Sequence, residues 1–192
     1  MGKLFSEILP EHEAFIQKQR IFFVGSAPLD EEGHVNLSPK GHDVLRILSP
    51  TEVAYLDLTG SGNETSAHLD ENGRITIMFT AFEGPPMILR LYGKGRVILP
   101  ETPEWEQMVR HFELILGARQ IIAVTLHAVK TSCGFSVPFF SYTGERDTLK
   151  KWAEVKCDDG LLAYHREKNS ESMDGRMTPI GRRFSESADA ID

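Results

Sequence analysis

One short stretch of the chain combines residue types that can hold a phosphate group. It reads DLTGSGNETS, covers residues 57–66, and follows the apolar run EVAYL. Its two glycines let main-chain N–H groups approach a ligand, while Asn63, Thr65 and Ser66 add side-chain donors. A helix starting here would add the partial positive charge of its N-terminus. The stretch is thus a candidate phosphate cradle, although an ordinary capped loop is the simpler explanation of the local sequence, and Glu64 disfavours an anion.

The familiar phosphate motifs do not occur in this stretch. A dinucleotide fingerprint requires glycine at its sixth position, where GSGNET has Thr65, and no strand–helix–strand unit surrounds it. A Walker loop requires Gly-Lys-Ser/Thr, and the stretch contains no lysine. A phosphate bound here must therefore find a cation elsewhere in the chain.

Lys40 is one candidate for that cation. It stands between Pro39 and Gly41 at the end of an expected strand, and its ammonium suits a dianionic phosphate as a point charge. A solvated lysine in a turn is the alternative. Arg90, Tyr92, Lys94 and Arg96 alternate along another expected strand, where they line either a basic cleft or a solvent-facing surface.

No other constellation in the sequence points to self-contained catalysis. The seven histidines lack metal-ligand spacing, and we find no catalytic triad, metal cluster or paired catalytic carboxylates. Cys133 and Cys157 read as reduced thiols, and Cys133 as a packing residue. We therefore assign no catalytic residue and no metal site. A bound redox cofactor would explain this pattern, because the cofactor then supplies the chemistry.

Composition limits the classes of partner. The chain has 192 residues and a formal net charge of −7, which suits one domain and disfavours nucleic-acid binding. It shows no secretory signal and no apolar run of membrane-spanning length, so we expect a cytoplasmic protein. The opening MGKLFS matches the loose myristoylation pattern, which often arises by accident.

The elements that must position these residues are mostly short strands. In the first half we expect a helix at 10–19, strands within 20–28, 34–39 and 51–59, and a connector with at most one helical turn at 41–50. A short helix follows at 62–72, with Asn63 as its N-cap.

In the second half, strands are expected within 74–82 and 87–99, and a long one within 119–137. Helices are expected at 103–116, capped by Thr102, and at 146–156 and 159–169, the first of these two capped by Asp147. Strands that do not alternate with long helices favour a mainly β fold, a small antiparallel barrel with peripheral helices. We expect one domain over 1–169 and a loose or partner-contacting tail over 170–192, where the pattern ends.

The ordered set of segments resembles a known family. IFFVGSAPLDEEGHVNLSPKG, then VAYLDLTGSGNETSAHLDENGRITIMF, then ILRLYGKGRVI are similar to the pyridoxamine 5'-phosphate oxidase-related family of FMN-binding split barrels, over roughly residues 15–130. The C-terminal KTSCGFSVPFF and GERDTLKKWAE resemble one uncharacterised subgroup of that family.

The resemblance implies a split antiparallel β-barrel that forms a homodimer, with FMN in a cleft between the subunits. The phosphate would be held by Ser38, Lys40, Asn63, Glu64 and Thr65. The flavin ring would lie near Asn36, Leu37, Tyr55, Leu56, Asp57 and Leu58, with Arg90 near the ring or the ribityl edge.

The sequence departs from the vitamin B6 oxidases themselves in two places. Those enzymes carry Ser-Arg-Lys where this chain has Asn63-Glu64-Thr65, so both cations are missing and the phosphate charge falls more on Lys40. Their C-terminal segments that recognise pyridoxal phosphate have no match in residues 170–192. FMN binding is thus expected, but oxidation of pyridoxine phosphate is not.

The leading hypothesis is an FMN-dependent oxidoreductase acting on an unidentified small molecule. Two alternatives use the same barrel: a non-catalytic flavin or haem binder, and a reductase dependent on the deazaflavin F420. The latter would want more basic residues along its groove than this acidic chain has. A structural interaction protein with an empty cleft is the remaining alternative.

Overall fold

The computed structural model describes residues 2–189 of the chain. Its strands are β1 (Leu4–Phe5), β2 (Phe22–Ser26), β3 (Asn36–Lys40), β4 (Leu45–Ser49), β5 (Glu52–Leu58), β6 (Arg74–Thr80), β7 (Ile88–Ile98) and β8 (Ala118–Ser132). Its helices are α1 (Pro10–Ile16), α2 (Glu64–Asn72), α3 (Pro103–Met108), the 3₁₀ turn η1 (Val109–His111), α4 (Thr148–Lys168) and α5 (Pro179–Asp189).

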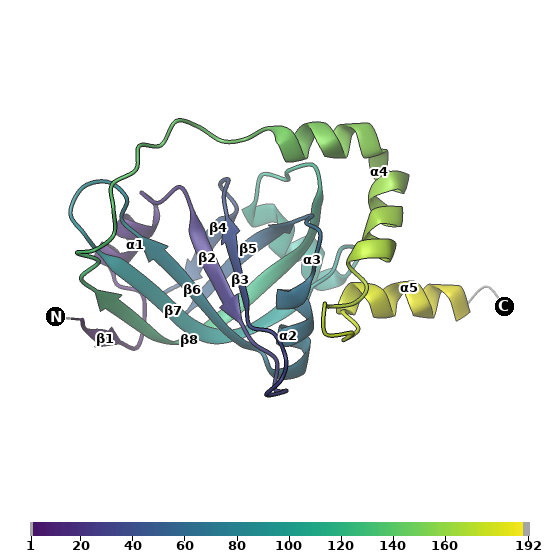
Figure 1. Cartoon of the computed structure of the whole chain (residues 1–192), viewed down its shortest axis with the longest axis horizontal. Coiled ribbons are helices and arrows are strands. Elements are labelled where there is room, and N and C mark those ends of the chain that lie inside the picture. The colour runs from purple at the N-terminus through teal and green to yellow at the C-terminus, as the bar shows by residue number, and fades with distance from the viewer. Residues whose placement is uncertain (1, 190–192) are drawn as a thin grey trace.

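The strands form one antiparallel sheet in the order β3-β2-β6-β7-β8-β5-β4, with β1 added beside β8. The sheet curls on itself, and the helices lie at its periphery (Figure 1). β3 and β4 stand at the two ends of the order, so each has a ladder partner on one side. The result confirms the predicted mainly β fold, a split barrel with peripheral helices, and the split lies beside β3.

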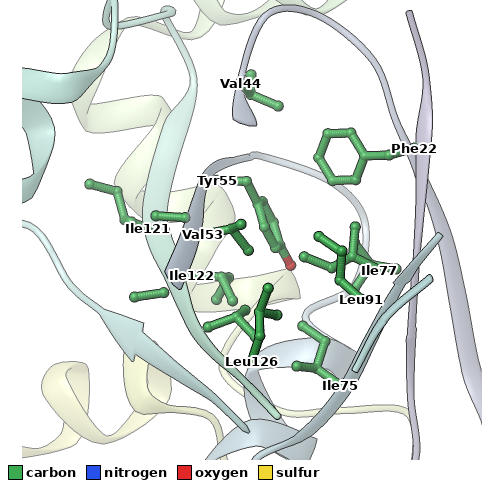
Figure 2. Packing of buried hydrophobic residues seen from close by; sticks show 14 of the residues in the cluster. Phe22, Val44, Val53, Tyr55, Ile75, Ile77, Leu91, Ile121, Ile122 and Leu126 are labelled. Atoms are coloured by element: carbon green, nitrogen blue, oxygen red, sulfur yellow. The ribbon is translucent and has the colours of Figure 1, made fainter. Parts of the chain in front are cut away.

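Apolar side chains from most of the strands fill the barrel interior. Tyr55 on β5 stands among Phe22, Ile77 and Leu91, and all four side chains are buried (Figure 2). A core packed in this way leaves little room for a cofactor inside the barrel. Binding sites are therefore to be sought at the split and at the rims.

Two glycines on β7 allow close neighbours: Gly95 allows helix α2 to approach the sheet, and Gly93 allows strand β8 to approach β7. A Cβ on Gly95 would lie 2.9 Å from both terminal methyl carbons of Leu69 on α2, and one on Gly93 would lie 2.5 Å from the main-chain oxygen of Thr125 on β8. The sequence pattern predicted bending or a close neighbour at these positions, and the structure provides the neighbour. α2 is thereby fixed against the barrel, together with the loop that precedes it.

The connector predicted over 41–50 is in part a strand. Leu45–Ser49 forms β4 and pairs antiparallel with β5, with a register shift between Ile47 and Ser49. The prediction was wrong because all five residues are partly buried, so the strand shows no alternation of buried and exposed positions. Their pairing partner β5, more than their own propensity, makes them a strand.

The helix predicted over 103–116 ends early. α3 stops at Met108, the 3₁₀ turn η1 follows, and Phe112 is extended. Phe112 and Ile115 still pack against the core, so the apolar stripe is buried without helical geometry. The predicted cap is confirmed, since Thr102 accepts a hydrogen bond from the main-chain N–H of Trp105 at 3.2 Å.

The two helices predicted over 146–156 and 159–169 run together as α4, with a kink at Cys157, whose φ is +54°. Asp147 is the N-cap residue but makes no side-chain capping bond; its carboxylate pairs with Lys151 at 2.6 Å.

Residues 170–192 were expected to form a loose or partner-contacting tail. The described part of this segment contains α5, and it lies against α2 and the end of α4 of the same chain (Figure 1).

Candidate functional site

Five of the predicted site residues meet across the gap between β3 and β5, which we call the barrel seam: Asn36, Ser38, Lys40, Asp57 and Thr65. Lys40 Nζ donates to Asp57 Oδ1 at 2.6 Å, and Asn36 Nδ2 donates to Thr65 Oγ1 at 2.9 Å. Ser38 Oγ donates to Asn36 Oδ1 at 3.2 Å on the same face of β3. Side chains thus bridge the split that the strand ladders leave open.

Behind the seam lies a buried ionic cluster. Asp57 Oδ2 accepts from Arg119 Nε and from Gln120 Nε2, both at 2.8 Å, while Oδ1 accepts from Lys40. Burial alone would raise the pKa of Asp57, but the charges of Arg119 and Lys40 outweigh burial and hold that pKa well below its ordinary value. Two cations therefore face one carboxylate, and the cluster carries a formal excess of positive charge.

The glycine loop, residues 59–63, is held from the barrel side by the same cluster. Arg119 Nη1 donates to the main-chain oxygen of Gly62 at 2.8 Å, and Gln120 Nε2 donates to Asn63 Oδ1 at 2.9 Å. Ser66 Oγ donates to Gln120 Oε1 at 3.3 Å. Asn63 precedes α2 as predicted but makes no side-chain capping bond, because its side chain is engaged in these contacts instead.

On its other side the glycine loop meets the strap, which we define as residues 169–178. Asn63 Nδ2 donates to the main-chain oxygen of Asn169 at 3.2 Å, and Asn169 Nδ2 donates to that of Gly60 at 3.0 Å. The carboxylate of Glu64 accepts from the main-chain N–H of Met173 at 3.1 and 3.2 Å. The loop is therefore held from both sides, while Gly60 and Ser61 remain exposed.

His165 on α4 anchors the start of the loop. Thr59 Oγ1 donates to the main-chain oxygen of Gly117 at 2.7 Å and lies 2.8 Å from His165 Nε2. Burial, with the charge of Arg119 in addition, lowers the pKa of His165 to about 4. The imidazole is therefore neutral at neutral pH and donates from Nε2 to Thr59.

The predicted site residues differ in how much of their side chains a ligand can reach. Those of Tyr55, Leu56, Asp57, Asn63 and Thr65 are buried in the protein. β5 pairs with β8 from Glu52 to Leu58, but its ladder with β4 ends at Tyr55. Tyr55, Leu56 and Asp57 therefore offer no exposed side chain to a flavin ring, and the expectation that the ring lies along them stays a prediction.

The remaining predicted residues are more accessible. Asn36, Ser38, Lys40, Leu58 and Glu64 are partly buried, and the Leu37 side chain is exposed on the opposite face of β3.

Arg90 lies apart from the seam. It stands near the start of β7, where it pairs with Met78 and Lys130 and donates to Ser132 Oγ at 3.0 Å. The other end of β7, at Ile98, pairs with Ile121 on β8, next to Gln120 of the ionic cluster.

Sequence reasoning missed Arg119, Gln120, His165 and Asn169. One signal was available: Arg119 and Gln120 open an otherwise apolar strand, and polar residues are rarely buried in such a strand without partners. No local signal marks His165 or Asn169, because their partners lie 106 positions away in the chain.

Two cavities lie beside α1, at the C-terminal end of β3 and the residues that follow it. The larger, about 1530 Å³, is lined by α1, the 81–87 turn and the 140–146 segment, and also by Pro39, Gly41 and His42 at the end of β3. The smaller measures about 490 Å³. Within the described part of the chain, neither is lined by the glycine loop.

Within residues 2–189, no group of His, Cys, Asp and Glu side chains gathers to hold a metal ion. No helix in the same range is long and apolar enough to cross a membrane.

Comparison with known proteins places these features in a family. The family model described as "Pyridoxamine 5'-phosphate oxidase" matches residues 8–133. The chain is 40% identical, over 175 residues, to the "Pyridoxamine 5'-phosphate oxidase family protein ustO" of Aspergillus flavus, covering 82% of this chain and 70% of that protein.

Two solved structures share the fold. HupZ of Group A Streptococcus matches with a TM-score of 0.51 and 19% identity, over 65% of this chain and 99% of that one. A putative pyridoxamine 5'-phosphate oxidase of Lactobacillus delbrueckii matches with a TM-score of 0.50 and 12% identity, over 65% and 94%. The matched region, residues 8–133, contains strands β2 to β8 and leaves out β1, α4 and α5. On these grounds the chain belongs to the pyridoxamine 5'-phosphate oxidase family.

Proposed function

We propose that this protein binds FMN at the barrel seam and acts as an FMN-dependent oxidoreductase on a small molecule. Membership of the pyridoxamine 5'-phosphate oxidase family supports a redox role. The lack of a catalytic triad or metal cluster among the described residues is consistent with chemistry supplied by a cofactor.

The observation that carries the proposal is the position of Lys40. Its side chain is 18% exposed and lies on the same face of the edge strand β3 as Ser38 and Asn36. An ammonium group has three donors, and Asp57 accepts from one of them. Because Arg119 also neutralises Asp57, Lys40 keeps charge to offer to a phosphate.

The seam and the glycine loop differ in how well they fit FMN. The seam offers a cation, a hydroxyl and an amide on a partly accessible strand face, which suits a phosphate or the polar ribityl chain. The loop and the start of α2 offer Asn63 and Thr65, which are buried and already bonded, and Glu64, which is an anion. We therefore assign the phosphate to Lys40, with Ser38 and Asn36 beside it, and not to the loop.

In this assignment the chain binds and orients the cofactor. FMN, when bound, supplies the ring that accepts and returns a hydride, so the protein needs no strong acid or base of its own. Lys40 balances the phosphate charge. The buried bonds of Lys40 and Asn36 to Asp57 and Thr65 hold the inner face of β3 in one geometry.

We further propose that two copies associate through the outer face of β3, with a flavin near each interface. Val35 and Leu37 are 76% and 67% exposed there, and such exposed apolar side chains on an edge strand favour pairing with another chain.

An absorption spectrum of the purified protein, before and after addition of FMN, tests the proposal. We expect a flavin spectrum that survives gel filtration and bleaches on anaerobic addition of NAD(P)H or dithionite. A colourless protein that takes up no FMN would exclude it. A haem Soret band or the spectrum of a deazaflavin would favour the two alternative cofactors, and a flavin that is bound but not turned over would favour a carrier.

A further inference from the structure

We propose that the glycine loop is the docking site of this chain's own strap, residues 169–178, and does not bind the phosphate of the flavin. The proposal builds on the proposed flavin site at the seam, because it states which part of the predicted phosphate site is already occupied. Three observations carry it: the bonds of the loop, the charge at the start of α2, and the anchoring of the strap.

The side-chain amide of Asn63 and the main-chain oxygens of Gly60 and Gly62 are bonded within the chain. Asn63, which is 2% exposed, donates to the main-chain oxygen of Asn169 and accepts from Gln120. Asn169 is fully buried and returns a bond to the main-chain oxygen of Gly60. A phosphate could reach Asn63 only by displacing Asn169, and the buried groups would then lose their partners.

The charge at the start of α2 is also matched by the strap. Glu64 opens the helix, and its carboxylate accepts from the main-chain N–H of Met173. A carboxylate at a helix N-terminus takes the place that an anion would otherwise occupy. A phosphate brought to this position would meet a like charge.

The strap is anchored along its length. Thr178 Oγ1 donates to the main-chain oxygen of Asn169 at 2.7 Å, which closes the strap into a compact turn. Two contacts link it to the body of the protein: His34 Nδ1 and Asp174 Oδ1 lie within hydrogen-bond distance at 2.6 Å, and Arg176 forms an ion pair with Glu71 on α2 at 2.7 Å. The strap is therefore a built part of the fold.

The residue types of the loop fit this partner. The sequence Asn63-Glu64-Thr65 contains no cation for a phosphate, and Glu64 is an anion. Here an amide donates to a peptide carbonyl, and a carboxylate accepts from a peptide N–H. These side chains complement a polypeptide segment, and phosphate recognition is left to the seam.

The first experiment removes the charge of Glu64. FMN and riboflavin, which differ by the phosphate, are titrated into the full-length wild type, Glu64→Gln, and Glu154→Gln as a control for net charge on an exposed face of α4. We expect the ratio of the two affinities to be the same in all three proteins. A ratio that rises by more than about threefold in Glu64→Gln alone would place the phosphate at the helix start and overturn the proposal.

The second experiment loosens the strap in the full-length chain. Hydrogen exchange of the main-chain amides of residues 59–66 is compared between wild type, Asn169→Ala/Thr178→Val, and Met173→Ala, whose exposed side chain leaves the Glu64 contact in place. We expect faster exchange in the double variant and wild-type exchange in Met173→Ala. Unchanged protection in a folded double variant would contradict docking of the strap on the loop.

The two proposals fail in different ways. A wild type that binds neither flavin overturns the proposed function, and hydrogen exchange, which needs no flavin, still decides whether the strap docks on the loop. A wild type that binds FMN through a Glu64-sensitive site leaves the proposed function standing and overturns the assignment of the loop.

Discussion

Lys40 serves the fold and the proposed cofactor at once. Its ammonium bonds to Asp57 across the seam and stands 5.8 Å from the centre of the Tyr55 ring. Because Arg119 also binds Asp57, the carboxylate keeps one buried cation when Lys40 is removed. A change at Lys40 can therefore be read mainly through ligand binding.

We predict that Lys40→Ala weakens FMN binding by about 1.5–3 kcal/mol, the usual range for a hydrogen bond to a charged group. Riboflavin binding should change less, since riboflavin lacks the phosphate. Fluorescence titration measures both affinities, and Lys130→Ala, an exposed lysine on β8, controls for net charge. Equal FMN affinity in Lys40→Ala and wild type would place the phosphate elsewhere.

Tyr55 carries a polar atom into the barrel core. Its hydroxyl is buried and has no hydrogen-bond partner among the described residues (Figure 2). Burial, and after it the charge of Asp57, raises the pKa of Tyr55 well above its ordinary value, so the hydroxyl stays protonated. The sequence resemblance implies that this residue faces the flavin ring, but its side chain is part of the core.

Tyr55→Phe should leave stability unchanged or raise it by up to about 1 kcal/mol, because a buried hydroxyl without a partner costs free energy in the folded state. Urea denaturation of both proteins measures the difference. FMN affinity should not change. A clear loss of stability would show that the hydroxyl has a partner, such as an internal water, in solution.

At the scale of elements, helix α4 is tied to the glycine loop through His165. The folded protein holds this imidazole neutral down to about pH 4, whereas in the unfolded chain it takes up a proton near its ordinary value of 6.5. Between these two values the unfolded state binds more protons, so stability falls as the pH decreases from 6.5 towards 4.

We predict that the loss of stability between pH 7 and pH 5 is smaller in His165→Gln than in wild type, by about 1–2 kcal/mol. Burial also lowers the pKa of His12 and His68, so part of the decline should persist in the variant. Denaturation curves at the two pH values give the result. Parallel declines in both proteins would contradict a buried neutral His165.

Elements whose signals are local could be predicted from the sequence. The cap at Thr102 and the alternation of β7 are properties of neighbouring residues, and both are found in the structure. β4 depends on its partner β5, and the early end of α3 depends on how Phe112 meets the core, so neither could be read from spacing.

The candidate site follows the same rule. Asn36, Ser38 and Lys40 share one face because strand side chains alternate. The resemblance named all three, but it assigned Ser38 and Lys40 to the phosphate and Asn36 to the ring, together with Leu37 of the opposite face. The pairing of Lys40 with Asp57 needs the curl of the whole sheet, and the burial of Arg119 needs Asp57 in register beside Gln120. These contacts join distant segments, for which a single sequence carries no local pattern.

At the scale of the whole molecule, the exposed face of β3 decides the proposed assembly. We predict that the wild type elutes at twice the 21.6 kDa of one chain and that Leu37→Lys elutes as a monomer, because a charge on this face opposes apolar association. Light scattering after gel filtration measures the mass. Leu162→Lys, on an exposed position of α4, is the control and should keep the wild-type mass.

Retained FMN in a monomeric Leu37→Lys protein would show that one chain suffices for the flavin. A dimeric Leu37→Lys protein would show that association uses another face. The exposed aromatic residues Phe135 and Phe139 mark the next surface to test in that case.

The docking of the strap also has a consequence for synthesis of the chain. Asn63 bonds to a residue 106 positions later, and the groups that complete the glycine loop extend to Thr178. On the ribosome, the strands through β8 emerge first, so the barrel can assemble while the loop still lacks its partners. The nascent chain therefore exposes its unfinished glycine loop until residues 169–178 have been made, and a message truncated before residue 169 would leave that loop open permanently.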